Sequence, residues 1–143
     1  MTEAVVVDAS LAVKWAIPEP YSERALELAE GWAGVGTRLL APCLLIAEVT
    51  NALYKRIARG ELDLATAEGA LEIILAFSIE LREEPGLPAR AMALAQEFQR
   101  STTYDCHYLA LAERYDCELW TGDRRFYNAV RAALRRVKCV ESD

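Results

Sequence analysis

The sequence predicts an α/β domain in which a mostly parallel central sheet is flanked by helices. Short apolar or β-branched runs alternate along the chain with segments of helical spacing, and this alternation is typical of parallel strands joined by helical crossovers. A hydrophobic fraction of 53% with 27% charged residues is that of a globular chain. No linker-like stretch divides the 143 residues, so we expect a single domain over residues 1–143.

Five segments have the composition of strands. The run Val5-Val6-Val7 is uninterrupted and β-branched, as in a strand that is buried on both faces. The segment at 79–81 is the weakest of the five. The expected strands cover residues 5–7, 39–41, 79–81, 118–121 and 137–140.

Helices are predicted between these strands from apolar spacing and from their start and stop residues. Ser10 is expected to cap a short turn that runs to Trp15. Pro42 suits a helix start because its missing N–H is not needed there, and Gly60 suits the end of that helix. Asp63 is expected to cap the next one. The expected helices cover residues 22–32, 42–59, 63–77, 88–98, 104–115 and 126–133.

The chain has no stretch long enough to span a bilayer, and its N-terminus lacks the basic lead of a secretory signal, so we expect a cytoplasmic protein without a membrane partner. Its four cysteines lack C-x-x-C spacing, and the single His107 cannot complete a common zinc pattern. We expect buried thiols rather than disulfides. A cysteine nucleophile acting with His107 is a minor alternative. The cysteines are Cys43, Cys106, Cys117 and Cys139.

The net charge of −6 by itself disfavours a nucleic-acid partner, because phosphates favour a basic face. The total hides a local excess of positive charge, since residues 124–138 contain six basic side chains and no acid. Such a run is as often a solvated surface as a binding surface. It begins directly after Asp123, however, so Arg124 and Arg125 are candidate RNA contacts.

Two aspartates follow predicted strands. Asp8 comes directly after the first strand, and Asp123 follows the strand at 118–121 across one glycine. Ligands of open parallel sheets bind beyond the carboxyl ends of the strands, so both carboxylates are expected at one edge of the sheet. Taken alone, each aspartate is more simply explained as a helix N-cap.

Two further acids interrupt apolar helix stripes. Glu48 shares a helical face with Leu44, Leu45 and Ala52, and Asn51 is its only polar neighbour one turn on. A buried carboxylate needs a partner, so a hidden salt bridge and a ligand site fit Glu48 equally well. Asp105 also precedes an apolar stripe, although an acid in a first helical turn is favoured by the helix dipole.

Four carboxylates at one edge would repel one another by roughly 1–4 kcal/mol per pair at about 4 Å, so such a cluster needs cations. An all-oxygen set of ligands without His or Cys favours Mg²⁺ or Mn²⁺ with bound water. The chain contains no EF-hand loop, no glycine-rich nucleotide-binding motif and no serine-hydrolase motif.

In this order and in these contexts the motifs resemble those of the PIN-domain ribonucleases. The motifs are Val-Val-Val-Asp8-Ala-Ser10, Ala-Pro42 before Glu48-Val-x-Asn51, Tyr-Asp105 before Tyr-Leu-Ala-Leu-Ala, and Thr121-Gly-Asp123-x-x-Phe126. The length of the chain and the span of the motifs are most similar to those of the VapC toxins of toxin–antitoxin pairs. The resemblance implies a PIN-like α/β/α sandwich.

The resemblance also implies a function, namely Mg²⁺- or Mn²⁺-assisted hydrolysis of an RNA phosphodiester by an endonuclease without a side-chain nucleophile. It further implies a small cognate antitoxin protein and a homodimer, for which the apolar helix at 73–77 offers surface. The implied catalytic and metal residues are Asp8, Glu48, Asp105 and Asp123, and the implied supporting residues are Ser10, Asn51, Thr121 and Asn128.

Two other function classes remain open. A non-catalytic binding module on the same fold is the main alternative, and the four intact acids argue against it. A receiver-like phosphoacceptor domain also places acids at strand ends, but Asp8 lacks a paired acid and no lysine follows a late strand in the expected way.

Overall fold

The computed structural model describes residues 3–141, which form five strands and seven helices. The sheet has the strand order β3-β2-β1-β4-β5, and every neighbouring pair is parallel. The predicted α/β class is therefore confirmed, with a sheet that is parallel throughout. The strands are β1 Ala4–Val7, β2 Arg38–Pro42, β3 Glu80–Arg82, β4 Glu118–Thr121 and β5 Val137–Cys139.

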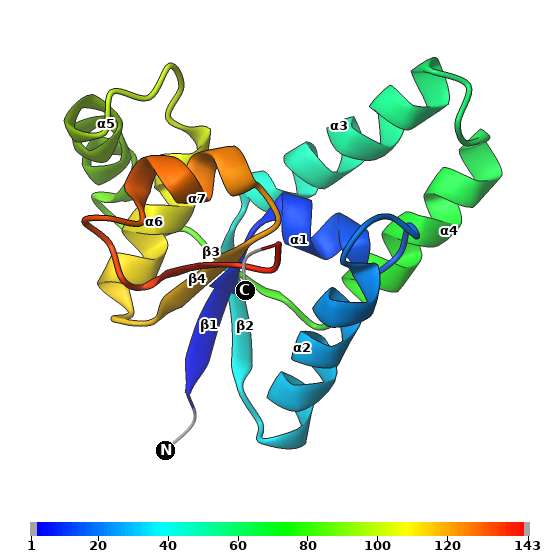
Figure 1. The fold of residues 1–143 in the computed structure, drawn as a ribbon, viewed down its shortest axis with the longest axis horizontal. Helices are drawn as coiled ribbons and strands as arrows, with labels where there is room; N and C mark the ends of the chain where they lie inside the picture. Colours follow the sequence, from blue (N-terminus) through cyan, green and yellow to red (C-terminus); the bar gives the residue numbers. More distant parts are fainter. Residues whose placement is uncertain (1–2, 142–143) are drawn as a thin grey trace.

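The helices form layers on both faces of this sheet. Figure 1 shows α5, α6 and α7 on one side and α1 and α2 on the other, while α3 and α4 extend away from the sheet as a pair. The arrangement is the expected α/β/α sandwich. The helices are α1 Ala9–Lys14, α2 Ser22–Gly34, α3 Leu44–Ala58, α4 Leu64–Leu75, α5 Leu87–Glu97, α6 Tyr104–Arg114 and α7 Arg124–Val130.

The core is built around the central strand and the most deeply buried helix. In β1, Val6 and Val7 are fully buried, as expected for a β-branched strand covered on both faces. Helix α6 packs across β1, β2 and β4. On the opposite side, Trp15 stacks on Phe77 with ring centroids 4.3 Å apart and donates its indole N–H to the carbonyl of Ala25 at 3.0 Å.

The N-cap interpretation of the two strand-end aspartates is confirmed, and it moves two helix starts from their predicted places. Asp8, not Ser10, caps α1 by accepting the Leu11 N–H at 3.0 Å. Asp123 caps α7 in the same way, so that helix begins before Phe126. The expected cap at Asp63 is confirmed, since its carboxylate accepts the Thr66 N–H at 2.8 Å.

Other sequence predictions need correction. Pro42 is the last residue of β2, not the first of a helix, and α3 begins at Leu44. All four cysteines are free, but only Cys106 and Cys139 are buried. Cys43 is exposed and stands in the turn between β2 and α3, as the N-cap residue of that helix. Within residues 3–141, no helix has the length and apolarity needed to cross a membrane.

Candidate active site at the carboxyl edge of the sheet

An open cleft of about 520 Å³ lies at the carboxyl ends of β1 and β4, the two central neighbours in the sheet. It receives one acid from each of four segments that are far apart in the sequence: the end of β1, helix α3, the first turn of α6 and the turn after β4. Parallel pairing is what brings the strand ends together. The four acids are Asp8, Glu48, Asp105 and Asp123.

Asp8 is the most enclosed of the four, with 6% of its surface exposed. Ser10 Oγ donates to Asp8 Oδ1 at 2.7 Å, and the Leu11 amide donates to the same oxygen at 3.0 Å. Burial raises the pKa of Asp8 to about 6, with a smaller contribution from the charge of Asp105, although hydrogen bonds oppose the rise. The carboxylate is thus held in place and poorly solvated.

A network of hydroxyl groups links the ends of β1 and β4. Ser10 Oγ lies 3.2 Å from Thr121 Oγ1 and accepts the Gly122 N–H at 2.8 Å. Thr121 Oγ1 in turn accepts the Asp123 N–H at 2.9 Å. These contacts fix the turn that carries Asp123 beside the turn that carries Asp8.

Gly122 is required in this turn by space. A Cβ at this position would lie 2.9 Å from the carbonyl oxygen of Ser10 and 2.8 Å from Cε of Lys14. The first contact is with backbone, which cannot swing aside. The glycine therefore allows the two strand-end turns to approach each other closely.

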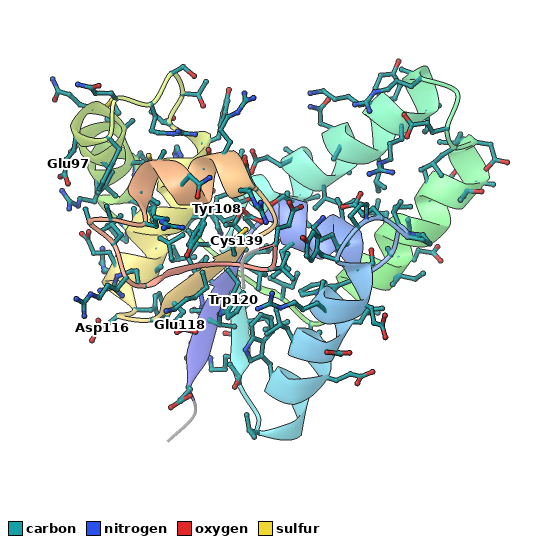
Figure 2. All side chains as sticks on the ribbon, viewed as in Figure 1. Glu97, Tyr108, Asp116, Glu118, Trp120 and Cys139 are labelled. Carbon is teal, nitrogen blue, oxygen red and sulfur yellow. The ribbon has the colours of Figure 1, made fainter. Side chains whose placement is uncertain are left out.

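Glu48 has an uncharged partner. Tyr108, which is 1% exposed, donates its hydroxyl to Glu48 Oε1 at 2.7 Å. Burial raises the pKa of Glu48 and the tyrosine hydrogen bond lowers it, while burial and the glutamate together raise the pKa of Tyr108. Figure 2 labels Tyr108 near the middle of the molecule, and its helix α6 packs on β1, β2 and β4.

The partner of Glu48 was not found from the sequence, because Tyr108 stands on an apolar stripe and looks like a core residue. Its hydroxyl was the available signal, since a buried tyrosine O–H generally needs an acceptor. No ion pair to Glu48 forms within residues 3–141, so the hidden salt bridge considered for it is not present.

The Asp105 carboxylate interacts electrostatically with a cation and with a neighbouring acid. Arg100 Nη2 lies 3.4 Å from Asp105 Oδ2. Burial and the charge of Asp123 raise the pKa of Asp105, and Arg100 lowers it. The repulsion expected among clustered carboxylates is therefore present at this residue.

Basic side chains also line the cleft, and the sequence interpretation did not place them there. Lys14 is 5% exposed, and its ammonium lies 3.1 Å from Glu19, 3.2 Å from Glu141 and 2.9 Å from the carbonyl of Pro20. A signal was available, since Lys14 follows Ser10 by four residues on one helix face. The other basic lining residues come from α3 and are Lys55, Arg56 and Arg59.

The remaining predicted residues divide into two groups. Ser10 and Asn51 line the cleft. Thr121 is buried beneath it. Asn128, Arg124 and Arg125 are exposed on α7 and stand outside the lining residues, and Arg124 donates to the backbone carbonyl of Glu141. Figure 2 places Asp116 and Glu118 near the opposite end of β4, so not every acid gathers at the cleft.

The donor set fits a hydrated hard cation. Within residues 3–141, no three Asp, Glu, His or Cys side chains converge closely enough to hold one ion by themselves. Mg²⁺ needs no such cage, because it keeps several waters and binds through one or two carboxylates. Among the described contacts, only Asp105 of the four acids forms an ion pair with a basic side chain, so negative charge in the cleft remains to be offset.

Comparison with known proteins gives a family match and likenesses to several solved structures. The family model of the PIN domain matches residues 5–132. The crystal structure of PAE2754 from Pyrobaculum aerophilum is similar with a TM-score of 0.69 at 28% identity, covering 99% of this chain and 93% of that one. The structure of VapC20 from Mycobacterium tuberculosis, a sarcin-ricin loop cleaving toxin, is similar with a TM-score of 0.66 at 18% identity, covering 87% of this chain and 94% of that one. No curated protein matches the chain.

Proposed function

The chain belongs to the PIN domain family, whose model matches residues 5–132, and from this membership we propose that it is a metal-dependent ribonuclease, the toxin of a VapBC-type toxin–antitoxin pair. The observation that carries the proposal is that the four predicted acids, which come from distant segments, line one cleft together with Glu19, Glu141 and four basic side chains. The likeness of the fold to a toxin that cleaves the sarcin-ricin loop supports RNA as the substrate.

The acids are the proposed metal ligands. Asp8 and Asp123 would bind one Mg²⁺ or Mn²⁺ directly, Asp105 would share or orient a second ion, and Glu48 would bind metal or a water on it. Such an ion, when bound, supplies a water of lowered pKa and offsets negative charge on the phosphate.

The chain itself contributes preorganisation. The Ser10 hydroxyl and the Leu11 amide hold the Asp8 carboxylate before any ligand arrives. Tyr108 fixes one oxygen of Glu48 and leaves the other for the cleft. Because these hydrogen bonds are formed within the fold, little rearrangement is needed when substrate binds.

Basic residues are the proposed contacts to the RNA backbone. Lys55 on α3 and Arg59 directly after it are exposed and line the cleft, so they are placed to contact phosphates of an RNA strand bound at the acids. Arg124 and Arg125 would extend this surface along α7. The net charge of −6 does not oppose RNA binding, because divalent ions would offset part of the acidic charge.

Two protein partners complete the proposal. A small antitoxin could inhibit the enzyme by placing a basic side chain among the cleft acids. A second copy could pack on apolar side chains that are exposed on α4, namely Leu64, Ile73 and Leu75. Relief of toxicity on co-expression tests the first interaction, and light scattering tests the second.

The proposal is tested by incubating the purified chain with single-stranded RNA in Mn²⁺ or in EDTA. We expect cleavage only with Mn²⁺, and none by Asp8→Asn. Asp116→Asn is the matched control, because its side chain is 91% exposed and lies at the far end of β4, and it should cleave as the wild type does. Cleavage by Asp8→Asn free of contaminating nuclease would refute the assigned role. RNA binding without cleavage by the wild type would favour the non-catalytic module.

A further inference from the structure

A second pocket, of about 660 Å³, is not used by the proposed mechanism. Its walls come from the turn between β2 and α3, the segment that joins β3 to α5, and the first turn of α6. In the sheet, β2 lies beside β1, and β3 lies beside β2 at the edge. The pocket therefore lies on the same carboxyl edge as the acidic cleft, at the neighbouring strands.

The cleft and this pocket share two helices. On α3, Leu44 lines the pocket and Glu48, one turn later, lines the cleft. On α6, Tyr104 and His107 line the pocket while Asp105 lines the cleft. One helical turn spans about 5.4 Å, so a strand of RNA whose phosphate lies among the acids has a neighbouring nucleotide within reach of the pocket.

The walls of the pocket suit an aromatic ring. Tyr104 stands at the start of α6 with 53% of its surface exposed, so much of this side chain is accessible to a ligand. Unpaired RNA bases characteristically stack on such side chains. Around it are five apolar residues: Pro42, Leu44, Pro85, Leu87 and Pro88.

The charged groups of the pocket favour a base over a phosphate. Glu83 and Glu84 line it, and their carboxylates repel phosphate but accept N–H groups. Glu84 already accepts the Tyr115 hydroxyl at 2.6 Å, whereas Glu83 is exposed. The one basic side chain of the lining, Arg82, is paired with Glu80 at 2.7 Å, which reduces its attraction for phosphate.

Two side-chain nitrogens of the lining residues can still form a hydrogen bond. The Nδ1 of His107 lies 2.9 Å from the carbonyl of Thr103, so Nδ1 carries a proton and Nε2 is left for another partner. The Nε of Arg82 is buried without a hydrogen-bond partner among the described residues. A ligand with both donors and acceptors on its edge, as nucleobases have, matches these groups.

We propose that this pocket binds one unpaired base of the RNA next to the cleaved phosphate, by stacking on Tyr104 and by hydrogen bonds from the amino group of the base to Glu83. The inference deepens the proposed function and rests on it. Adenine, cytosine and guanine carry an exocyclic amino group, whereas uracil offers only its N3–H between two carbonyl oxygens that a carboxylate repels, so we expect uracil to bind less tightly at this position.

The test measures binding and cleavage separately. Short fluorescein-labelled homopolymers of adenosine, cytidine and uridine are titrated with protein in Ca²⁺ and followed by anisotropy, and cleavage of the same RNAs is measured in Mn²⁺. The variants are Tyr104→Ala, Tyr104→Phe and Glu83→Gln. Tyr54→Ala is the control, because Tyr54 is equally aromatic and 64% exposed but faces the groove between α3 and α4.

We expect the wild type to bind adenosine and cytidine polymers more tightly than uridine polymer. Tyr104→Ala should weaken binding by about 5- to 150-fold, the range for loss of one stacked base, while Tyr104→Phe keeps the ring and the affinity. Glu83→Gln should lose the preference against uridine. Wild-type affinity in Tyr104→Ala would overturn the base site.

The two measurements separate this inference from the proposed function. Binding that depends on Tyr104, without cleavage by the wild type, would support the base site and refute the ribonuclease. Cleavage in Mn²⁺ with RNA affinity and cut sites unchanged in Tyr104→Ala would support the ribonuclease and refute the base site. Neither binding nor cleavage by the wild type would refute both.

Discussion

Replacing Asp8 with Asn should stabilise the metal-free protein at neutral pH. Burial raises the pKa of Asp8 from 3.8 to about 6. At about 1.36 kcal/mol per pKa unit, this difference corresponds to about 3 kcal/mol of stability that the fold loses when the buried carboxyl is ionised. Asn removes the charge and remains a good N-cap for α1, so the variant should recover most of this energy.

The size of this stability difference depends on pH. Below pH 3.8 the carboxyl is protonated in both the folded and the unfolded chain, so Asp8 and Asn differ little. As the pH rises towards about 6, the unfolded chain releases this proton while the folded chain retains it, and wild-type stability falls relative to the variant. Above about pH 6 the full difference in free energy of unfolding between the two proteins persists.

Urea unfolding in EDTA, followed by tryptophan fluorescence across this pH range, measures the difference between the two proteins. Asp116→Asn should show no pH-dependent gain, because its carboxylate is almost fully exposed. Adding Mg²⁺ should stabilise the wild type and reduce or reverse the advantage of Asp8→Asn. A variant that is less stable than the wild type at neutral pH in EDTA, or a difference that does not change with pH, would refute the reasoning.

Three further outcomes are expected. Gly122→Ala should lower the free energy of unfolding by about 1–3 kcal/mol and reduce cleavage, because the added Cβ meets the Ser10 carbonyl; thermal melts and turnover measure both. Lys14→Met should cost about 1–3 kcal/mol in chemical unfolding, since Glu141 loses this cation and Glu19 keeps only Arg56, and unchanged stability would contradict the importance of the Lys14 ion pairs. Replacing both Arg124 and Arg125 with Ala should reduce the slope of log affinity against log salt for single-stranded RNA by about 1.4, at about 0.7 per phosphate contact, and an unchanged slope would remove them from the interface.

Much of the fold could be predicted because its signals are local. The run Val5-Val6-Val7 and the strand at 118–121 are recognisable from their own residues, and both lie where expected. The errors occur where a neighbouring element decides the outcome. Pro42 suits a helix start, but pairing of β2 with β3 extends the strand through it.

The acids of the candidate site could also be predicted, because Asp8 and Asp123 follow strands and Glu48 interrupts an apolar stripe. The residues that form hydrogen bonds or ion pairs around the site could not be predicted. Tyr108 lies 60 positions from Glu48, and Lys14 meets Glu141 only through the path of the chain after β5. Contacts of this kind depend on how elements pack and leave no periodic pattern in the sequence.

Anomalous diffraction from crystals soaked in Mn²⁺ tests most directly whether the cleft acids bind a divalent cation for RNA cleavage. We expect a peak in the cleft within bonding distance of Asp8 or Asp123, directly or through one water, and its loss in Asp8→Asn. A wild-type crystal that shows no cleft peak at Mn²⁺ concentrations supporting RNA cleavage, or a peak that persists unchanged in Asp8→Asn, would contradict it.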